Sequence, residues 1–153
     1  MTPISVTLEI VHARTLAAVR REVAPGGVAA AWGPAVSKVW DFLRARPGLR
    51  TDGHNIFLYH QPRPDLPIQC DFGVEVTRSF ERVGEVYATE TPAGEAAVAV
   101  LRGPYSRMNE PYVAIENWIT ANGREPGGYT WEIYGDPMPD PADTETTVVR
   151  LLK

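Results

Sequence analysis

Apolar side chains recur at helical spacing in two segments of the chain. Intervals of four, three and four residues separate Trp32, Val36, Val39 and Leu43 and, again, Met108, Tyr112, Ile115 and Ile119. This spacing gathers the apolar side chains on one face of a helix. It predicts a first helix over residues 28–46, stopped by Pro47-Gly48, and a second over residues 106–122, stopped by Asn122-Gly123.

Short segments rich in β-branched and apolar residues surround the two helices. Residues 5–11 and 16–23 predict two strands around the turn HART, and residues 84–90 and 96–101 predict two strands around TPAGE. We expect each of these pairs to form a hairpin. Further strands are expected around residue 57 and over residues 71–76, 129–134 and 146–151, so that each half reads β-β-α-β-β.

The strand motif that follows the first helix recurs after the second. LYHQPRPD (58–65) and IYGDPMPD (133–140) share Tyr-x-x-Pro-x-Pro-Asp, which places Tyr59 over Tyr134, Pro62 over Pro137 and Pro64 over Pro139. The same alignment, continued along the chain, places DFGVEV (71–76) over TTVVRL (146–151). A shared motif at constant spacing indicates a duplication. We therefore expect one domain over residues 1–153, built from pseudo-repeats 1–77 and 83–153.

The predicted fold class is α+β, a tandem duplication with two helices packed on about eight antiparallel strands. Each half alone is too small to bury both faces of its sheet. The halves must therefore pack together, and the central groove at their junction is a favoured place for a ligand.

Composition and charge narrow the class of partner. The 153 residues carry a formal charge of −4 at pH 7, with no basic stripe, which argues against direct nucleic-acid binding. No apolar run approaches the roughly 20 residues of a membrane helix, and the N-terminal segment does not resemble a signal peptide. The single cysteine, Cys70, fits a reducing compartment. These features predict a cytoplasmic protein that does not contact a membrane.

Motifs for metals and cofactors are missing from the sequence. His12, His54 and His60 lie in separate turns and strand ends without the spacing of metal ligands. There is no phosphate-binding loop and no nucleophile elbow. We expect neither a metal nor a cofactor.

One carboxylate, Glu132, stands inside an aromatic-rich strand. Alternation along residues 129–134 places Thr130, Glu132 and Tyr134 on one face and Trp131 on the other. In the alignment of the repeat, Phe57 occupies the position of Glu132 in the first half. An acidic and an aromatic position together suit a flat organic cation, because ring faces attract positive charge.

Structural roles that require no ligand are alternative interpretations of the same residues. Glu132 faces solvent on an edge strand, or it pairs with an arginine such as Arg102. Tyr59 and Tyr134 are either groove walls or core aromatics whose hydroxyls find a partner. Helical spacing makes the core the default place for Tyr112 and Trp40, whereas Tyr105 precedes its helix and is free to lean into the groove. Trp131 is expected to pack beneath its strand against a helix.

Three blocks of the sequence together resemble a known family. LYHQP…CDFGVEV, LRGPYSRMNEPYVAIENWI and WEIYGDP…TVVRLLK are similar to the GyrI-like (gyrase-inhibitor-like) small-molecule-binding domain, which is also the effector-binding domain of MerR- and AraC-type transcription regulators. The similarity is clearest in Gly103-Pro104-Tyr105, in Tyr59-His60 and in residues 131–134. It implies a multidrug-type pocket for aromatic, often cationic molecules, with Glu132 at its floor. No helix-turn-helix precedes the first predicted strand, so the expectation is a stand-alone member rather than a DNA-binding regulator.

Three functions follow from these residues. The first is a non-enzymatic protein that binds or sequesters a cationic aromatic drug or toxin. Glu132 would be its anchor, and its groove would be lined by Trp40, Phe57, Tyr59, Tyr105, Tyr112, Trp131 and Tyr134. The second is a hydrolase of cyclopropane-bearing electrophilic natural products, serving drug resistance, with Glu132 and Tyr134 as catalytic groups. The third is an interaction with a protein partner, either DNA gyrase or a separate regulator.

Overall fold

The computed structural model describes residues 4–60, 65–136 and 138–153 and has the predicted α+β architecture. The elements in chain order are β1 (Val6–Val11), β2 (Thr15–Val23), α1 (Val28–Arg44), η1 (Pro47–Leu49), β3 (Arg50–His60), β4 (Ile68–Val76), β5 (Tyr87–Glu90), β6 (Gly94–Arg102), η2 (Tyr105–Arg107), α2 (Asn109–Ala121), β7 (Pro126–Tyr134), η3 (Pro141–Asp143) and β8 (Glu145–Leu152). Both predicted helices are confirmed, although each is shorter than expected. Pro34 lies inside α1. Gly123, at φ 63°, takes the left-handed conformation that ends α2.

The described strands form one antiparallel sheet in the order β1-β6-β8-β7-β3-β4-β2-β5. The expected hairpins, 5–11 with 16–23 and 84–90 with 96–101, are wrong. Strand β1 pairs with β6, and β5 pairs with β2, so each half contributes its first strand to the other half. The hydrophobic pattern could not reveal this exchange, because alternation specifies which face of a strand is buried and not which strand lies beside it.

The two short connections that follow the exchanged strands are hydrogen-bonded to each other. The backbone N–H of Arg14 donates to Thr91 Oγ1 at 2.9 Å, and the N–H of Thr91 donates to the carbonyl of Arg14 at 3.0 Å. Thr91 is almost fully buried at this crossing. The connections between β1 and β2 and between β5 and β6 therefore lie side by side.

The sheet register relates the two halves by an approximate two-fold axis. Phe57 on β3 is the cross-strand partner of Glu132 on β7, so two residues that the repeat aligns with each other lie at the axis. Phe57 also pairs with Phe72, and Glu132 with Val148, so Phe72 corresponds to Val148. The alignment of DFGVEV with TTVVRL predicted from the sequence sets Phe72 over Thr147. It is therefore wrong by one residue, because the sheet register sets Phe72 over Val148. Within the aligned motifs, Pro62, Pro64 and Pro137 lie outside the described residues.

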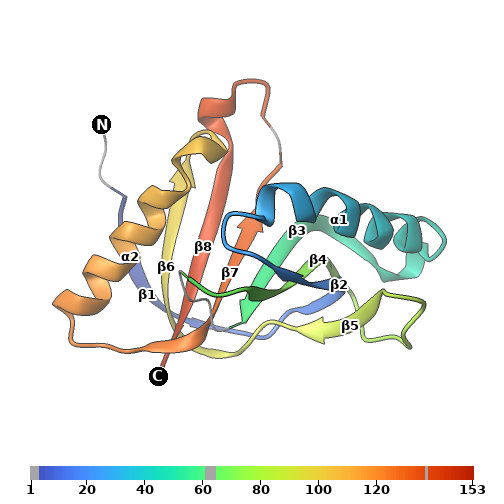
Figure 1. Ribbon diagram of the computed structural model, residues 1–153, viewed down its shortest axis with the longest axis horizontal. Coiled ribbons are helices and arrows are strands. Elements are labelled where there is room, and N and C mark those ends of the chain that lie inside the picture. Colours follow the sequence, from blue (N-terminus) through green and yellow to red (C-terminus); the bar gives the residue numbers. More distant parts are fainter. Residues whose placement is uncertain (1–3, 61–64, 137) are drawn as a thin grey trace.

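Both helices lie on one face of the curved sheet, on either side of the central strands (Figure 1). Helix α1 packs on β2 and β4, and α2 packs on β6, β1 and β8. The other face carries its own apolar cluster, built from strand residues that include Leu16, Leu58 and Trp131. None of the described helices is long and apolar enough to span a membrane.

Candidate ligand-binding site

A cavity of about 750 Å³ lies between the two helices, over the middle of β3 and β7. Residues of α1 line one side of it, residues of η2 and α2 line the other, and residues of β3 and β7 line its floor. Seven of the residues predicted for the groove line this cavity, namely Trp40, Phe57, Tyr59, Tyr105, Tyr112, Glu132 and Tyr134. The structure thus brings together side chains from both halves of the chain.

Trp131 is the predicted groove residue that the structure places elsewhere. Its side chain is 2% exposed and belongs to the cluster on the face away from the helices. It neither lines the cavity nor packs against a helix. Adjacent strand residues point to opposite faces, so Trp131 and its neighbour Glu132 cannot both face the cavity.

Seven of the residues that line the cavity are tryptophan, tyrosine or phenylalanine. The ring centroids of Phe57 and Tyr134 are 4.7 Å apart, and Tyr105 lies 5.6 Å from Tyr134. Trp32, on α1, lies 6.0 Å from Phe57 and was not predicted as a site residue. Trp32 and Tyr105 are 42% and 52% exposed, so they form the rim. Such rings offer a flat apolar guest a large contact area.

Glu132 lies at the floor and is 6% exposed. Its Oε1 accepts hydrogen bonds from the hydroxyls of Tyr59, at 2.8 Å, and Tyr134, at 2.5 Å, and its Oε2 accepts one from Tyr112. Strand β7 lies between β8 and β3, so Glu132 is not on an edge strand. Arg102, the alternative partner, pairs with Asp143 at 3.4 Å instead.

The three tyrosines are held in their neutral form. Burial, together with the negative charge of Glu132, raises the pKa of Tyr59, Tyr112 and Tyr134 far above the usual tyrosine value. Their hydroxyls therefore stay protonated and act as donors. The carboxylate receives three hydrogen bonds but no positive charge from them.

No lysine or arginine is found among the described residues that line the cavity. Arg150, on β8 next to Thr130 of β7, forms an ion pair with Glu116 of α2 at 3.5 Å. At the rim, His54 Nδ1 lies 3.8 Å from the carboxylate of the exposed Asp136. The cavity thus combines apolar walls with an uncompensated buried carboxylate and a second carboxylate at the rim.

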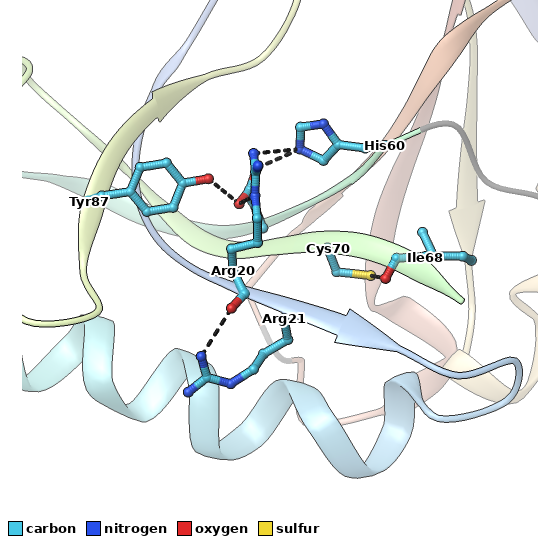
Figure 2. Close-up of polar contacts among 7 residues, drawn as sticks. Arg20, Arg21, His60, Ile68, Cys70 and Tyr87 are labelled. Carbon is cyan, nitrogen blue, oxygen red and sulfur yellow. Dashed lines mark hydrogen bonds and ion pairs between the residues drawn. The ribbon is translucent and has the colours of Figure 1, made fainter. Parts of the chain in front are cut away.

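A second buried carboxylate, Asp71 on β4, lies on the opposite face of the sheet, since its cross-strand partner is Leu58. It accepts hydrogen bonds from Arg20 Nε at 3.0 Å and from the hydroxyl of Tyr87, and His60 Nε2 lies 2.6 Å from it. Figure 2 shows Arg20, His60 and Tyr87 converging on this point, on the side of the strands away from α1. Sequence reasoning missed this cluster because its members come from four strands.

The donors around Asp71 decide its protonation. Burial alone would raise its pKa, but the hydrogen bonds from His60, Arg20 and Tyr87 outweigh burial and lower the pKa to about 2. Burial and the bond to Asp71 raise the pKa of Tyr87 to about 12. Within the described residues, no group of three histidine, cysteine or acidic side chains is arranged to hold a metal ion.

Comparison with known proteins connects this architecture to one family. The model of the GyrI-like small-molecule-binding domain matches residues 5–151. The crystal structure of the EcmrR C-terminal domain superposes with a TM-score of 0.81 at 20% identity, with 98% of both chains covered. The chain corresponds to 57% of the longer EcmrR chain seen in a complex with DNA.

Two further solved structures share the fold. SAV2435, described as bound to tetraphenylphosphonium, has a TM-score of 0.67 at 11% identity, with 97% of this chain and 94% of that chain covered. A protein from Listeria innocua described as a hydrolase has a TM-score of 0.64 at 12% identity, with 99% and 93% covered. No curated protein matches the chain.

Proposed function

Since the chain belongs to the GyrI-like small-molecule-binding family, we propose that it binds hydrophobic, cationic aromatic compounds in the cavity between α1 and α2. The observation that carries this proposal is the set of groups that surround the carboxylate of Glu132. Its carboxylate is buried and bonded by three neutral hydroxyls, and no lysine or arginine is found among the described residues that line the cavity.

The physical argument concerns the cost of a buried charge. A carboxylate taken out of water loses several kcal/mol of solvation, and neutral hydrogen bonds recover only part of this. A cationic guest supplies the missing opposite charge in a medium of low dielectric constant. The faces of Phe57, Tyr134 and Tyr105 add roughly 0.5–2 kcal/mol for each well-placed contact with the cation.

The test measures the affinity for rhodamine 6G, a planar aromatic cation, by fluorescence titration. Glu132→Gln keeps the size and polarity of the side chain but removes its charge. We expect it to weaken binding by more than about tenfold. Asp136→Asn is the matched control, because Asp136 is an exposed rim carboxylate and its loss should change affinity by less than about threefold. Equal affinity of Glu132→Gln and wild type would rule out the anchor.

The neighbours supply an independent probe. SAV2435 is described as bound to tetraphenylphosphonium, an aromatic cation. Tetraphenylphosphonium therefore serves as a second probe in calorimetric titrations of the same variants. A binding protein of this kind would sense or sequester its guest without converting it.

A second candidate function is hydrolysis of an electrophilic strained ring. The observation that favours it is the contact of Glu132 with Tyr134 and two further hydroxyls, since a carboxylate that orients water beside hydrogen-bond donors can act as a general base. Incubation with a cyclopropane-bearing alkylating compound, followed by mass spectrometry, would detect the water adduct. The adduct should vanish with Glu132→Gln, and its absence with wild-type protein would exclude this function.

A further inference from the structure

One wall of the cavity carries a hydrogen bond between α1 and β3. The indole Nε1–H of Trp40 donates to Oδ1 of Asn55 at 3.2 Å, and both side chains line the cavity. An indole nitrogen can only donate. The carbonyl arm of the amide must therefore face Trp40, and this fixes the orientation of its NH2 arm.

The NH2 group of Asn55 has two N–H donors. Neither of them forms a hydrogen bond with an acceptor in the part of the chain that the structure describes. Among the same residues, Thr146 Oγ1 is the one fully enclosed side-chain polar atom without a partner. The Asn55 nitrogen is therefore not sealed inside the protein, and a molecule in the cavity can reach it. A donor held in a fixed orientation on an apolar wall is suited to a ligand acceptor.

The sheet register places this donor close to Glu132. Phe57 is the cross-strand partner of Glu132, and Asn55 lies two residues before Phe57 on the same face of β3. Such diagonal neighbours in an antiparallel sheet are about 7–8 Å apart. The cavity thus presents an anionic acceptor and a neutral donor at a separation that a molecule of two or three fused rings can span.

The other half of the molecule shows that the fold does not require this pair. When the apolar stripes of the two helices are aligned, Trp40 corresponds to Glu116, which is exposed and pairs with Arg150. When the repeated strand motifs are aligned, Asn55 corresponds to Thr130. The second half forms the same helix and strands without an indole–amide bond. The fold therefore does not need the hydrogen bond between Trp40 and Asn55, which is a local feature of the cavity wall.

We propose that Asn55 determines which cationic aromatic compounds the cavity prefers, by donating its NH2 group to a carbonyl, ester or ether oxygen on the ligand. Trp40 is a positioning residue that holds the amide in the donating orientation. The inference rests on the proposed function, since the ligand acceptor adds to the charge interaction with Glu132. The inference predicts that the protein discriminates between two aromatic cations, one with an oxygen acceptor and one without.

The experiment compares rhodamine 6G, which carries ester and ether oxygens, with tetraphenylphosphonium, which carries no acceptor. Asn55→Leu keeps the number and branching of the side-chain heavy atoms and removes the donor. We expect this variant to lose about five- to tenfold in affinity for rhodamine 6G and less than about twofold for tetraphenylphosphonium. Thermal unfolding of each variant verifies that it is folded.

Trp40→Phe tests the positioning role and leaves Asn55 in place. Without the indole N–H the amide is free to rotate, so we expect about a two- to fivefold loss for rhodamine 6G alone. Equal losses for both probes, or no loss for either, would overturn the inference and leave the proposed function standing. If wild-type protein binds neither probe, both fail. If it binds tetraphenylphosphonium as tightly as rhodamine 6G, and Asn55→Leu does not change this ratio, the donor role alone fails.

Discussion

Glu132 and Asp71 are both buried carboxylates, but the sheet separates them onto opposite faces and their partners differ in kind. Asp71 is bonded by the guanidinium of Arg20, by His60 and by a tyrosine. Glu132 is bonded by three tyrosines and opens into a cavity. The charge of Asp71 is neutralised within the protein, whereas the hydrogen-bond partners of Glu132 are all neutral. The comparison teaches that the partner, and not burial itself, decides whether a buried carboxylate is neutralised within the protein. Under the proposed function, the carboxylate without a cationic partner is the one that binds the guest.

The largest expected effect is that two variants respond in opposite ways, one losing stability and the other losing affinity. Asp71→Asn removes the negative charge that pairs with the guanidinium of Arg20, so we expect a loss of about 2–4 kcal/mol in the free energy of unfolding. Rhodamine 6G affinity should stay within about twofold of wild type. Glu132→Gln should do the opposite, with less than about 1 kcal/mol lost in stability and most of the affinity gone. Urea denaturation and dye titration on both proteins measure the two quantities. Loss of binding in a folded Asp71→Asn protein would break the comparison.

The next effect is the dependence of stability on acid. The pKa of Asp71 is lowered to about 2 in the folded protein, below the value of about 4 in an unfolded chain. Its contribution is therefore fully present above about pH 4 and is lost as the pH falls towards about 2. We expect a decline of about 2 kcal/mol across this window. Asp71→Asn should show a flatter profile in urea denaturation at a series of pH values, and an unchanged slope would contradict the assignment.

The smallest effect concerns the hydroxyls around Glu132. Tyr59→Phe removes one of three donors, so we expect about 1 kcal/mol of destabilisation at neutral pH. The pKa of Tyr59 is raised by burial and by Glu132, so its contribution is present below about pH 10 and is lost as the pH rises further. The variant should therefore lose stability less steeply than wild type above pH 10.

Absorbance at 295 nm, which follows tyrosinate, gives a control for this alkaline prediction. Tyr87, with a pKa of about 12, should ionise before Tyr59, Tyr112 and Tyr134, which should ionise only when the protein unfolds. Ionisation of all six tyrosines near pH 10 in the folded protein would disprove the neutral-donor description of the cavity.

The sequence was most informative where the two halves could be compared. The repeated motif brought Phe57 and Glu132 into correspondence, and the structure pairs these two residues across β3 and β7. Alternation also placed Trp131 opposite Glu132, but it could not say which face the helices cover. The sequence therefore places Trp131 in the predicted groove, whereas the structure places it on the other face of the sheet.

Interactions between distant elements could not be predicted in the same way. The bond between Trp40 and Asn55 depends on the rotation of α1 about its axis, and helical spacing defines a face of that helix but not its neighbours. The cluster at Asp71 joins residues of β2, β3, β4 and β5, so it requires the strand order. The correct alignment of β4 with β8 needed the sheet register for the same reason.

The exchange of first strands has a consequence for the order in which the protein folds. Val6 on β1 pairs with Ala99 on β6, so β1 has no strand partner among the described residues until more than half of the 153 residues have followed it. Pairings of such long sequence separation slow folding. They also make each half depend on the other, because neither can complete its own sheet. We therefore expect the two halves to fold as a single cooperative unit rather than as two independent ones. The cavity between α1 and α2, which both halves line, would form only when that unit is complete.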